Sequence, residues 1–157
     1  MATSIKTPPG ASFAFEMGIR TLDDQLRRVD SFDTKAGILI AADGVLAGLL
    51  FSARPSLVGS PRVLAISVAF LVTMSLLLAL IAFANRRYRT APQPTAVVRM
   101  MSAPEPWLKW RFLGNLEEAI MANEKKLVWK ARFLSAALTT VFVAVGILGA
   151  YAVYAVL

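Results

Sequence analysis

The sequence contains neither cysteine nor histidine. The missing cysteines exclude disulfide bonds and thiolate chemistry, and the missing histidines exclude imidazole bases and the commonest ligand of transition metals. Catalysis needs acid, base or nucleophile groups that converge in a pocket, and acids near the N-terminus instead pair with arginines four positions later, as Asp23 does with Arg27. We therefore expect no enzyme activity, no catalytic residue, no metal site and no cofactor.

Acidic residues are also few, because ten Asp and Glu stand against seventeen Lys and Arg, for a net charge of +7. Such an excess can indicate nucleic-acid binding. Here the basic residues flank apolar segments and form no single basic helix and no nucleic-acid motif. We therefore predict no nucleic-acid partner, and we assign the charge to membrane topology and to attraction by anionic lipid.

Apolar residues are abundant, at 57% of the chain. A helix needs roughly 20 apolar residues to cross the hydrocarbon layer of a bilayer, and three segments come close: 36–53, 63–84 and 133–157. We predict an all-α integral membrane protein with these segments as its three transmembrane helices. The first is not expected to be a signal peptide, because 35 residues precede it and no small-residue cleavage site follows it.

Charge sets the expected orientation, because short cytoplasmic loops retain Lys and Arg. Residues 1–35 carry five of them and residues 85–132 carry ten, whereas residues 54–62 carry two. We expect the N-terminus in the cytoplasm and the C-terminus outside. The expected order is a disordered N-terminus (1–12), a cytoplasmic amphipathic helix (13–35), span one (36–53), a short external loop (54–62), span two (63–84), a cytoplasmic loop and helix (85–132) and span three (133–157).

Two apolar stripes predict a cytoplasmic helical layer. The first has spacings of four and three, typical of an amphipathic helix, over Phe15, Ile19, Leu22, Leu26 and Val29. The second belongs to a helix that begins near Trp107 and continues into the third span, with Leu113, Leu116, Ile120, Leu127, Leu134 and Leu138. We expect one long helix there, with the N-terminal helix packed against it.

Small residues mark one face of the first span. Gly37, Ala41, Gly44 and Gly48 fall within about 60° of arc at about 100° per residue, and such faces let helices approach closely. The face can serve contact between copies of the chain, which three spans need in order to enclose a lumen. It can equally pack against another span of the same chain.

Asp43 interrupts the apolar run of that span. A carboxylate at the centre of a membrane helix costs about 2.5–3.5 kcal/mol on insertion scales, so a compensating partner is expected. Ser75 on the second span and Thr139 or Thr140 on the third come to similar depth, and a hydroxyl among them can donate to the carboxylate. The alternative is that Asp43 lines a wet path when an assembly opens.

Two stretches resemble a known family. "FDTKAGILIAADGVLAGLL" (32–50) places an Asp-x-Lys-Ala step before a small-residue-rich span, and "LEEAIMANEKKLVWKARFLSAAL" (116–138) is a charged helix leading into a last span. Over about residues 13–157 the chain resembles the Pycsar effector family of bacterial membrane proteins, and its plan is similar to that of the SLATT effectors. The landmarks of the resemblance are Asp33, Lys35, Ala36, Asn123, Glu124, Lys126, Lys130 and Ala131.

The resemblance implies antiphage defence at the bacterial inner membrane. A partner cyclase would make cyclic UMP or cyclic CMP on infection, and the effector would respond by impairing the lipid bilayer until the cell stops growing. A pore or a disruptive assembly of a chain with three spans requires a homo-oligomer. The alternative is a non-sensing structural or assembly subunit of a larger membrane complex, and a neighbouring cyclase gene would discriminate between the two.

A cyclic mononucleotide presents one phosphate charge and a flat base, so its site needs Arg or Lys donors and an aromatic face. The candidates follow the second span or lie in "PWLKWRF" (106–112); they are Arg87, Arg89, Trp107, Lys109, Trp110 and Arg111. Each has an alternative role, because the arginines are also ordinary cytoplasmic anchors and the tryptophans also suit the membrane interface. No Gly-rich phosphate loop occurs in the sequence, and the pocket can also form between subunits.

Overall fold

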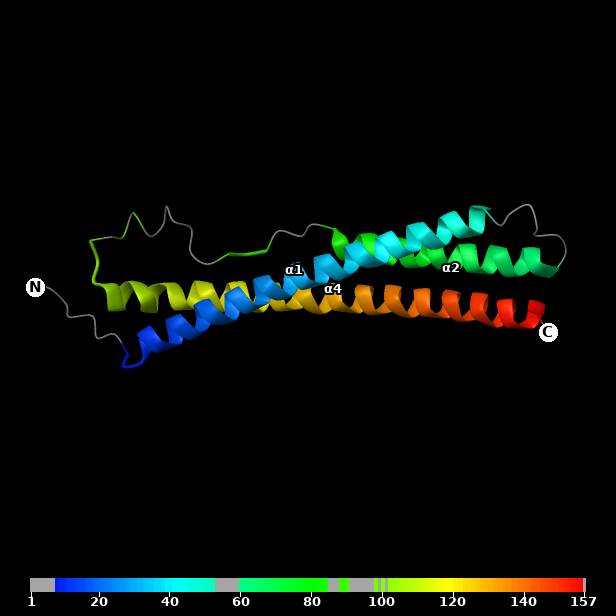
Figure 1. Ribbon diagram of the computed structural model, residues 1–157. Helices are drawn as coiled ribbons and strands as arrows, with labels where there is room; N and C mark the ends of the chain where they lie inside the picture. Colours follow the sequence, from blue (N-terminus) through cyan, green and yellow to red (C-terminus); the bar gives the residue numbers. More distant parts are fainter. Residues whose placement is uncertain are drawn as a thin grey trace, which may run out of the picture. The chain divides into compact units, whose positions relative to one another are not determined.

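The computed structural model describes residues 8–52, 60–84, 88–90, 98, 100 and 102–156, with the side chains at 60–61 and 154–156 excepted. Three helices make up most of this part: α1 (Ala11–Ser52), α2 (Ser60–Phe83) and α4 (Glu105–Val156) (Figure 1). No strand occurs among these residues. Each helix is long and apolar enough to cross a membrane, which confirms the predicted all-α class with three candidate spans.

Helix α1 begins after a turn at Gly10, whose φ of 93° is a left-handed conformation that favours glycine. At the start of the helix the Ala11 N–H donates to the Pro8 carbonyl at 3.2 Å. The helix then runs for 42 residues. The segments 13–35 and 36–53, expected as a cytoplasmic helix and a separate first span, are therefore parts of one uninterrupted helix.

Helix α4 begins at Glu105, two residues before the expected start at Trp107. The carbonyl of Pro104 accepts hydrogen bonds from the N–H groups of Trp107 and Leu108 at 3.0 and 3.1 Å. Glu105 adds a negative charge to the first turn, where the helix dipole is positive. The helix extends over 52 residues, so the charged stretch and the third apolar segment form one helix, as expected.

The chain divides into two compact units, and α1 and α4 take part in both. Unit 1 comprises Met1–Val29 and Arg86–Val128, and unit 2 comprises Asp30–Asn85 and Trp129–Leu157. In unit 1 the core contains Leu22, Val29, Leu116 and Leu127 of the two apolar stripes, together with Phe112 and Ala119, which lie outside the predicted stripes. A Cβ added to Gly18 would lie 2.3 Å from the Leu116 side chain. The N-terminal part of α1 therefore packs closely on α4, as the matched stripes predict.

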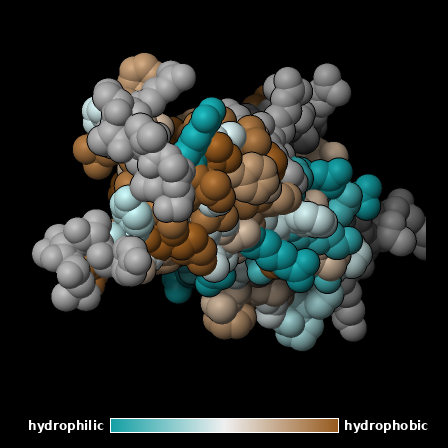
Figure 2. Space-filling view, turned by 90° about the vertical axis from the view of Figure 1, so that its right-hand side faces the viewer, coloured by the Kyte–Doolittle hydropathy of each residue, from teal (hydrophilic) through white to brown (hydrophobic). Residues whose placement is uncertain are grey.

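In unit 2 all three helices pack around small and aliphatic side chains. One cluster contains Ala36, Leu39, Ala79, Ala82, Leu134, Ala137 and Val141, and a second contains Val68, Val72 and Ala144. Large apolar side chains point outward from the same helices, such as Val45, Phe70 and Phe142, which are 64%, 65% and 67% exposed. Figure 2 shows apolar side chains, in brown, gathered on part of the surface. An apolar surface of this extent suits contact with hydrocarbon better than contact with water.

Candidate functional site

A hydrogen-bonded polar cluster lies inside unit 2, where the three helices meet. Asp43 of α1 is 1% exposed, and Ser75 of α2 is fully buried. The Ser75 hydroxyl lies within donating distance of two acceptors, Asp43 Oδ2 at 2.9 Å and the Ala137 carbonyl oxygen of α4 at 3.1 Å. Within the described ranges Asp43 Oδ1 has no hydrogen-bond partner. Through Ser75 the cluster connects all three helices.

Ser75 is thus the hydroxyl donor that the structure places at Asp43. Thr139 and Thr140 instead donate to carbonyls one turn earlier in α4, those of Ser135 and Ala136, at 3.0 and 2.8 Å. The expected hydroxyl donor to Asp43 is therefore present and is Ser75, whereas Thr140, named with it as a possible donor, is not part of this contact. The physical reason is that a threonine in a helix can satisfy its proton on its own backbone.

Three landmarks of the resemblance, Asp33, Asn123 and Lys130, form polar contacts. In unit 2, Lys130 forms an ion pair with Asp33, and the two side chains are 5% and 35% exposed. In unit 1, the side-chain amide of Asn123 pairs with the backbone of Arg89. The Arg89 N–H donates to Asn123 Oδ1 at 2.9 Å, and Asn123 Nδ2 donates to the Arg89 carbonyl at 2.8 Å.

Three further landmarks have identified surroundings. Ala36 is fully buried in the first core cluster of unit 2. The Lys35 ammonium lies 6.0 Å from the centre of the Phe32 ring, and that of Lys126 lies 5.7 Å from the centre of the Tyr88 ring. Both distances are within the range of about 6 Å for cation–π attraction, so these lysines are held by aromatic side chains nearby.

The sequence pattern did not identify several residues that take part in unit 1, namely Gly18, Gln25, Tyr88 and Glu118. Gln25 is 4% exposed, and its Nε2 donates to Glu124 at 3.0 Å and to the Ile120 carbonyl at 3.2 Å. Gln25 lies three residues after Leu22 and four before Val29, on the buried side of α1. A polar residue on such a stripe usually has a partner, and this signal could have identified it.

Four of the candidate nucleotide-binding residues lie in the first two turns of α4: Trp107, Lys109, Trp110 and Arg111. Trp110 is 44% exposed and Arg111 is exposed as well. Lys109 is already paired, with Nζ 2.9 Å from Glu105 and 3.6 Å from Glu16. Its hydrogen bond to Glu105 is the main cause that raises the pKa of the lysine. Trp110 and Arg111 are therefore the accessible members of this group.

Arg89, the described candidate that follows the second span, lies outside this group. Arg89 forms an ion pair with Glu118, which follows Arg111 by seven residues, or about 10 Å along the helix at a rise of about 1.5 Å per residue. Arg87 lies outside the described residues. The described candidates thus form two separate groups on unit 1.

The small-residue face of the first span is open. Nothing lies within 4 Å of a Cβ added at Gly37, Gly44 or Gly48, and Ala41 is exposed. The alternative in which this face packs against another span of the same chain is therefore not what the described residues show. The face is free to contact another copy or lipid.

No protein-family model matches the chain, and no curated protein and no solved structure is detectably similar to it. In the described part of the chain, no group of three acidic residues is placed to hold a metal ion. The three long apolar helices are compatible with a multi-pass membrane protein.

Proposed function

We propose that this chain is a membrane effector of antiphage defence of the Pycsar type, located in the inner membrane of a bacterium. Unit 1 lies in the cytoplasm and binds cyclic UMP or cyclic CMP from a partner cyclase, and the helices of unit 2 span the membrane. Binding drives association of copies of the chain. The assembly impairs membrane integrity, and the infected cell stops growing or dies. The chain acts by binding and carries out no catalysis.

The polar landmarks support this proposal most directly. Asp33 pairs with Lys130 in unit 2, and Asn123 pairs with the Arg89 backbone in unit 1. Asn123 and Lys130 are buried, and buried polar groups are costly to leave without partners. The stretches that resemble the family therefore contain the contacts on which this architecture depends.

The organisation of the helices supports the coupling of sensing to membrane damage. α1 and α4 each contribute to both units without a break. A ligand that favours one arrangement of these helices in unit 1 can shift the population of arrangements in unit 2. The exposed Trp110 and Arg111 offer an aromatic face and a guanidinium for the base and the phosphate.

Dye entry into cells tests the function. The chain is expressed with an active pyrimidine cyclase or with an inactive variant of that cyclase, and a membrane-impermeant dye is added. We expect dye to enter only with the active cyclase. The purified chain in liposomes should release a trapped dye when cyclic UMP or cyclic CMP is added, and not when cyclic AMP is added. Release that ignores the nucleotide, or no release in either assay, contradicts the proposal and favours a non-sensing membrane subunit.

A pair of tryptophan variants tests the site. Trp110→Ala should abolish nucleotide-dependent dye release, because the base loses its aromatic face. Trp129→Ala is the matched control, since Trp129 is 52% exposed on the same helix but belongs to unit 2. Equal nucleotide responses in the two variants would remove Trp110 from the binding site.

A further inference from the structure

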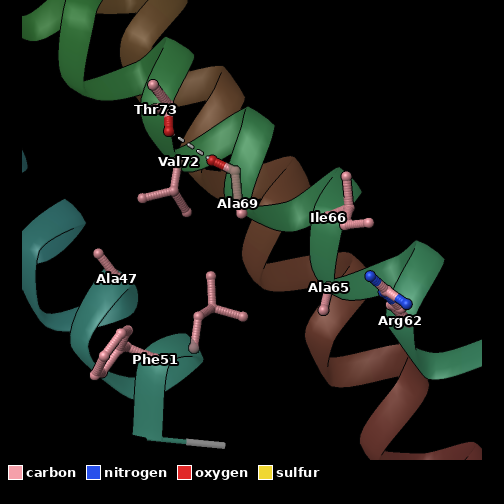
Figure 3. A pocket seen from close by; sticks show the side chains of 9 residues that line it. Ala47, Phe51, Arg62, Ala65, Ile66, Ala69, Val72 and Thr73 are labelled. Carbon is pink, nitrogen blue, oxygen red and sulfur yellow. Dashed lines mark hydrogen bonds between the residues drawn. The ribbon is translucent and has the colours of Figure 1, made fainter. Parts of the chain in front are cut away.

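A groove lies between α1 and α2 in unit 2, near the end of α1 and the start of α2 (Figure 3). Ala47, Leu50 and Phe51 line it from α1, and residues between Arg62 and Thr73 line it from α2. Its volume is about 600 Å³, within the roughly 300–1,000 Å³ of sites that hold small ligands. The groove is therefore large enough for a ligand of more than a few atoms.

The walls of the groove are apolar. Ala65 and Ala69 of α2 face Ala47 of α1 across it (Figure 3), and these small side chains leave the space open. Thr73 brings the one hydroxyl of the lining, which donates to the Ala69 carbonyl at 2.8 Å. Water needs two to four polar partners in a cavity, and these walls offer few, so hydrocarbon is the better occupant.

The positively charged side chain of Arg62 lies at one end of the groove. Figure 3 shows Arg62 at the end of the lining on α2, and no described acid forms an ion pair with it. The sequence has no Asp or Glu between Asp43 and Glu105 and none after Glu124, so no acidic side chain at this end of the three spans can serve as a counter-ion. Arg62 also lies in the first turn of α2, where the helix dipole adds positive potential.

We propose that the groove binds one acyl chain of a membrane phospholipid, with the lipid phosphate paired to Arg62. A phospholipid joins a long apolar chain to an anionic head group. The apolar groove matches the chain, and the positive charge of Arg62 matches the head group. Hydrocarbon in the groove restores the dispersion contacts that an empty space would lose. The phosphate supplies the charge-assisted partner that the guanidinium lacks among the described residues of unit 2. Occupancy depends on insertion of the spans in a membrane and not on a nucleotide.

A second copy of the chain fits this groove less well than a lipid. Copies inserted in the same orientation bring the same ends of their spans together. In the sequence that end carries Arg54 and Arg62 and no acidic side chain, so a neighbouring copy would add positive charge where a negative charge is needed. A lipid phosphate has the opposite sign.

Photocrosslinking of the full chain tests the lipid site, with no nucleotide present. The chain is reconstituted in phosphatidylcholine vesicles that contain phosphatidylglycerol with a diazirine in one acyl chain, and labelled peptides are identified by mass spectrometry. We expect several-fold stronger labelling at residues 47–51 and 62–73 than on other exposed apolar faces. Ala69→Leu fills the groove and should remove this excess. Ala136→Leu, at an exposed alanine of α4 outside the lining, should retain it.

The arginine is tested with Arg62→Gln, which should lower labelling of the groove several-fold, and with Arg132→Gln as a control at an exposed arginine away from the groove. Excess inorganic phosphate should not compete with the lipid, because it has no acyl chain. Uniform labelling along the helices, unchanged by Ala69→Leu, would overturn the proposal. Competition by phosphate alone, or crosslinked dimers that form through the groove in place of lipid adducts, would overturn it as well.

Discussion

Asn123 of α4 holds the backbone of Arg89 with both ends of its side-chain amide, through hydrogen bonds of 2.9 and 2.8 Å. Asn123 is fully buried, so water cannot replace either bond. The Arg89 side chain also pairs with Glu118. Residues 88–90 are thereby fastened to α4 in unit 1.

Asn123→Asp should release this segment, because a carboxylate has no proton to donate to the Arg89 carbonyl. A buried polar group without a partner costs about 1–3 kcal/mol, so the thermal midpoint in detergent should fall and trypsin should cleave faster after Arg89. Asn115→Asp makes the same change at an exposed position of α4. If both variants are cleaved at the wild-type rate, the amide contact does not hold the segment.

Gly18→Val should destabilise unit 1, because the added Cβ would lie 2.3 Å from the Leu116 side chain. Overpacking of this kind costs about 1–3 kcal/mol. Gly114→Val is the control, since nothing lies within 4 Å of a Cβ at Gly114. Adding Leu116→Ala to Gly18→Val should recover part of the loss in a double-mutant cycle. Strictly additive effects would show that the two residues are not in contact.

Lys130→Met should lower the free energy of unfolding by about 1–3 kcal/mol, because it leaves the partly exposed carboxylate of Asp33 without its partner. Lys125→Met, at an exposed lysine of the same helix, should have little effect. Replacing both partners, with Asp33→Leu and Lys130→Met together, should restore much of the stability because no charge remains unpaired. Thermal unfolding in detergent measures all three. A double variant that is less stable than Lys130→Met alone would argue against the pairing.

Asp43→Asn should leave the ion permeability of reconstituted liposomes unchanged, because Asp43 is 1% exposed and bonded to Ser75. Asparagine keeps the shape, and its Nδ2 can donate to the serine oxygen. Asp43→Leu removes the carboxylate acceptor, so the Ser75 hydroxyl can donate only to the Ala137 carbonyl. The cation-to-anion permeability ratio is the measurement. A marked loss of cation preference in Asp43→Asn would instead assign the carboxylate to a wet path.

Gly44→Leu should weaken contact between copies of the chain if the open face of α1 is the oligomer contact of the proposed effector. Leucine prevents the close approach that small residues allow. Gly146→Leu is the control, because Gly146 of α4 also has open space at its Cβ position. Chemical crosslinking in membranes and toxicity in cells should both fall in Gly44→Leu alone. Unaltered crosslinks and unaltered toxicity would remove this face from the assembly.

The three candidate spans could be predicted from the sequence because a membrane sets a minimum length of apolar helix. The packing of α1 on α4 could also be predicted, because the apolar stripes that contain Leu22 and Leu116 each need a partner that covers them. The presence of a hydroxyl near Asp43 could also be anticipated, because few polar groups reach that depth. The particular donor could not, since Ser75 and Thr140 each have a backbone carbonyl as an alternative acceptor.

The contact of Asn123 with the backbone of Arg89 could not be predicted from the sequence. Asn123 binds the N–H and the carbonyl of Arg89, and any residue except proline would present the same two groups. The groove beside Arg62 likewise depends on how far α1 and α2 separate over Ala47 and Ala69. Neither spacing nor residue type determines that separation.

The partners that build unit 1 are far apart in the chain, and Gln25 and Glu124 are 99 positions apart. A ribosome adds roughly 5–20 residues per second, so Leu22 and Val29 emerge roughly 5–20 s before the part of α4 that covers them. In that interval the first two apolar segments have already left the ribosome and can enter the membrane. The stripe on α1 must be shielded meanwhile by a chaperone or by the bilayer surface. Insertion of the two candidate spans in α1 and α2 can therefore begin before unit 1 is able to fold.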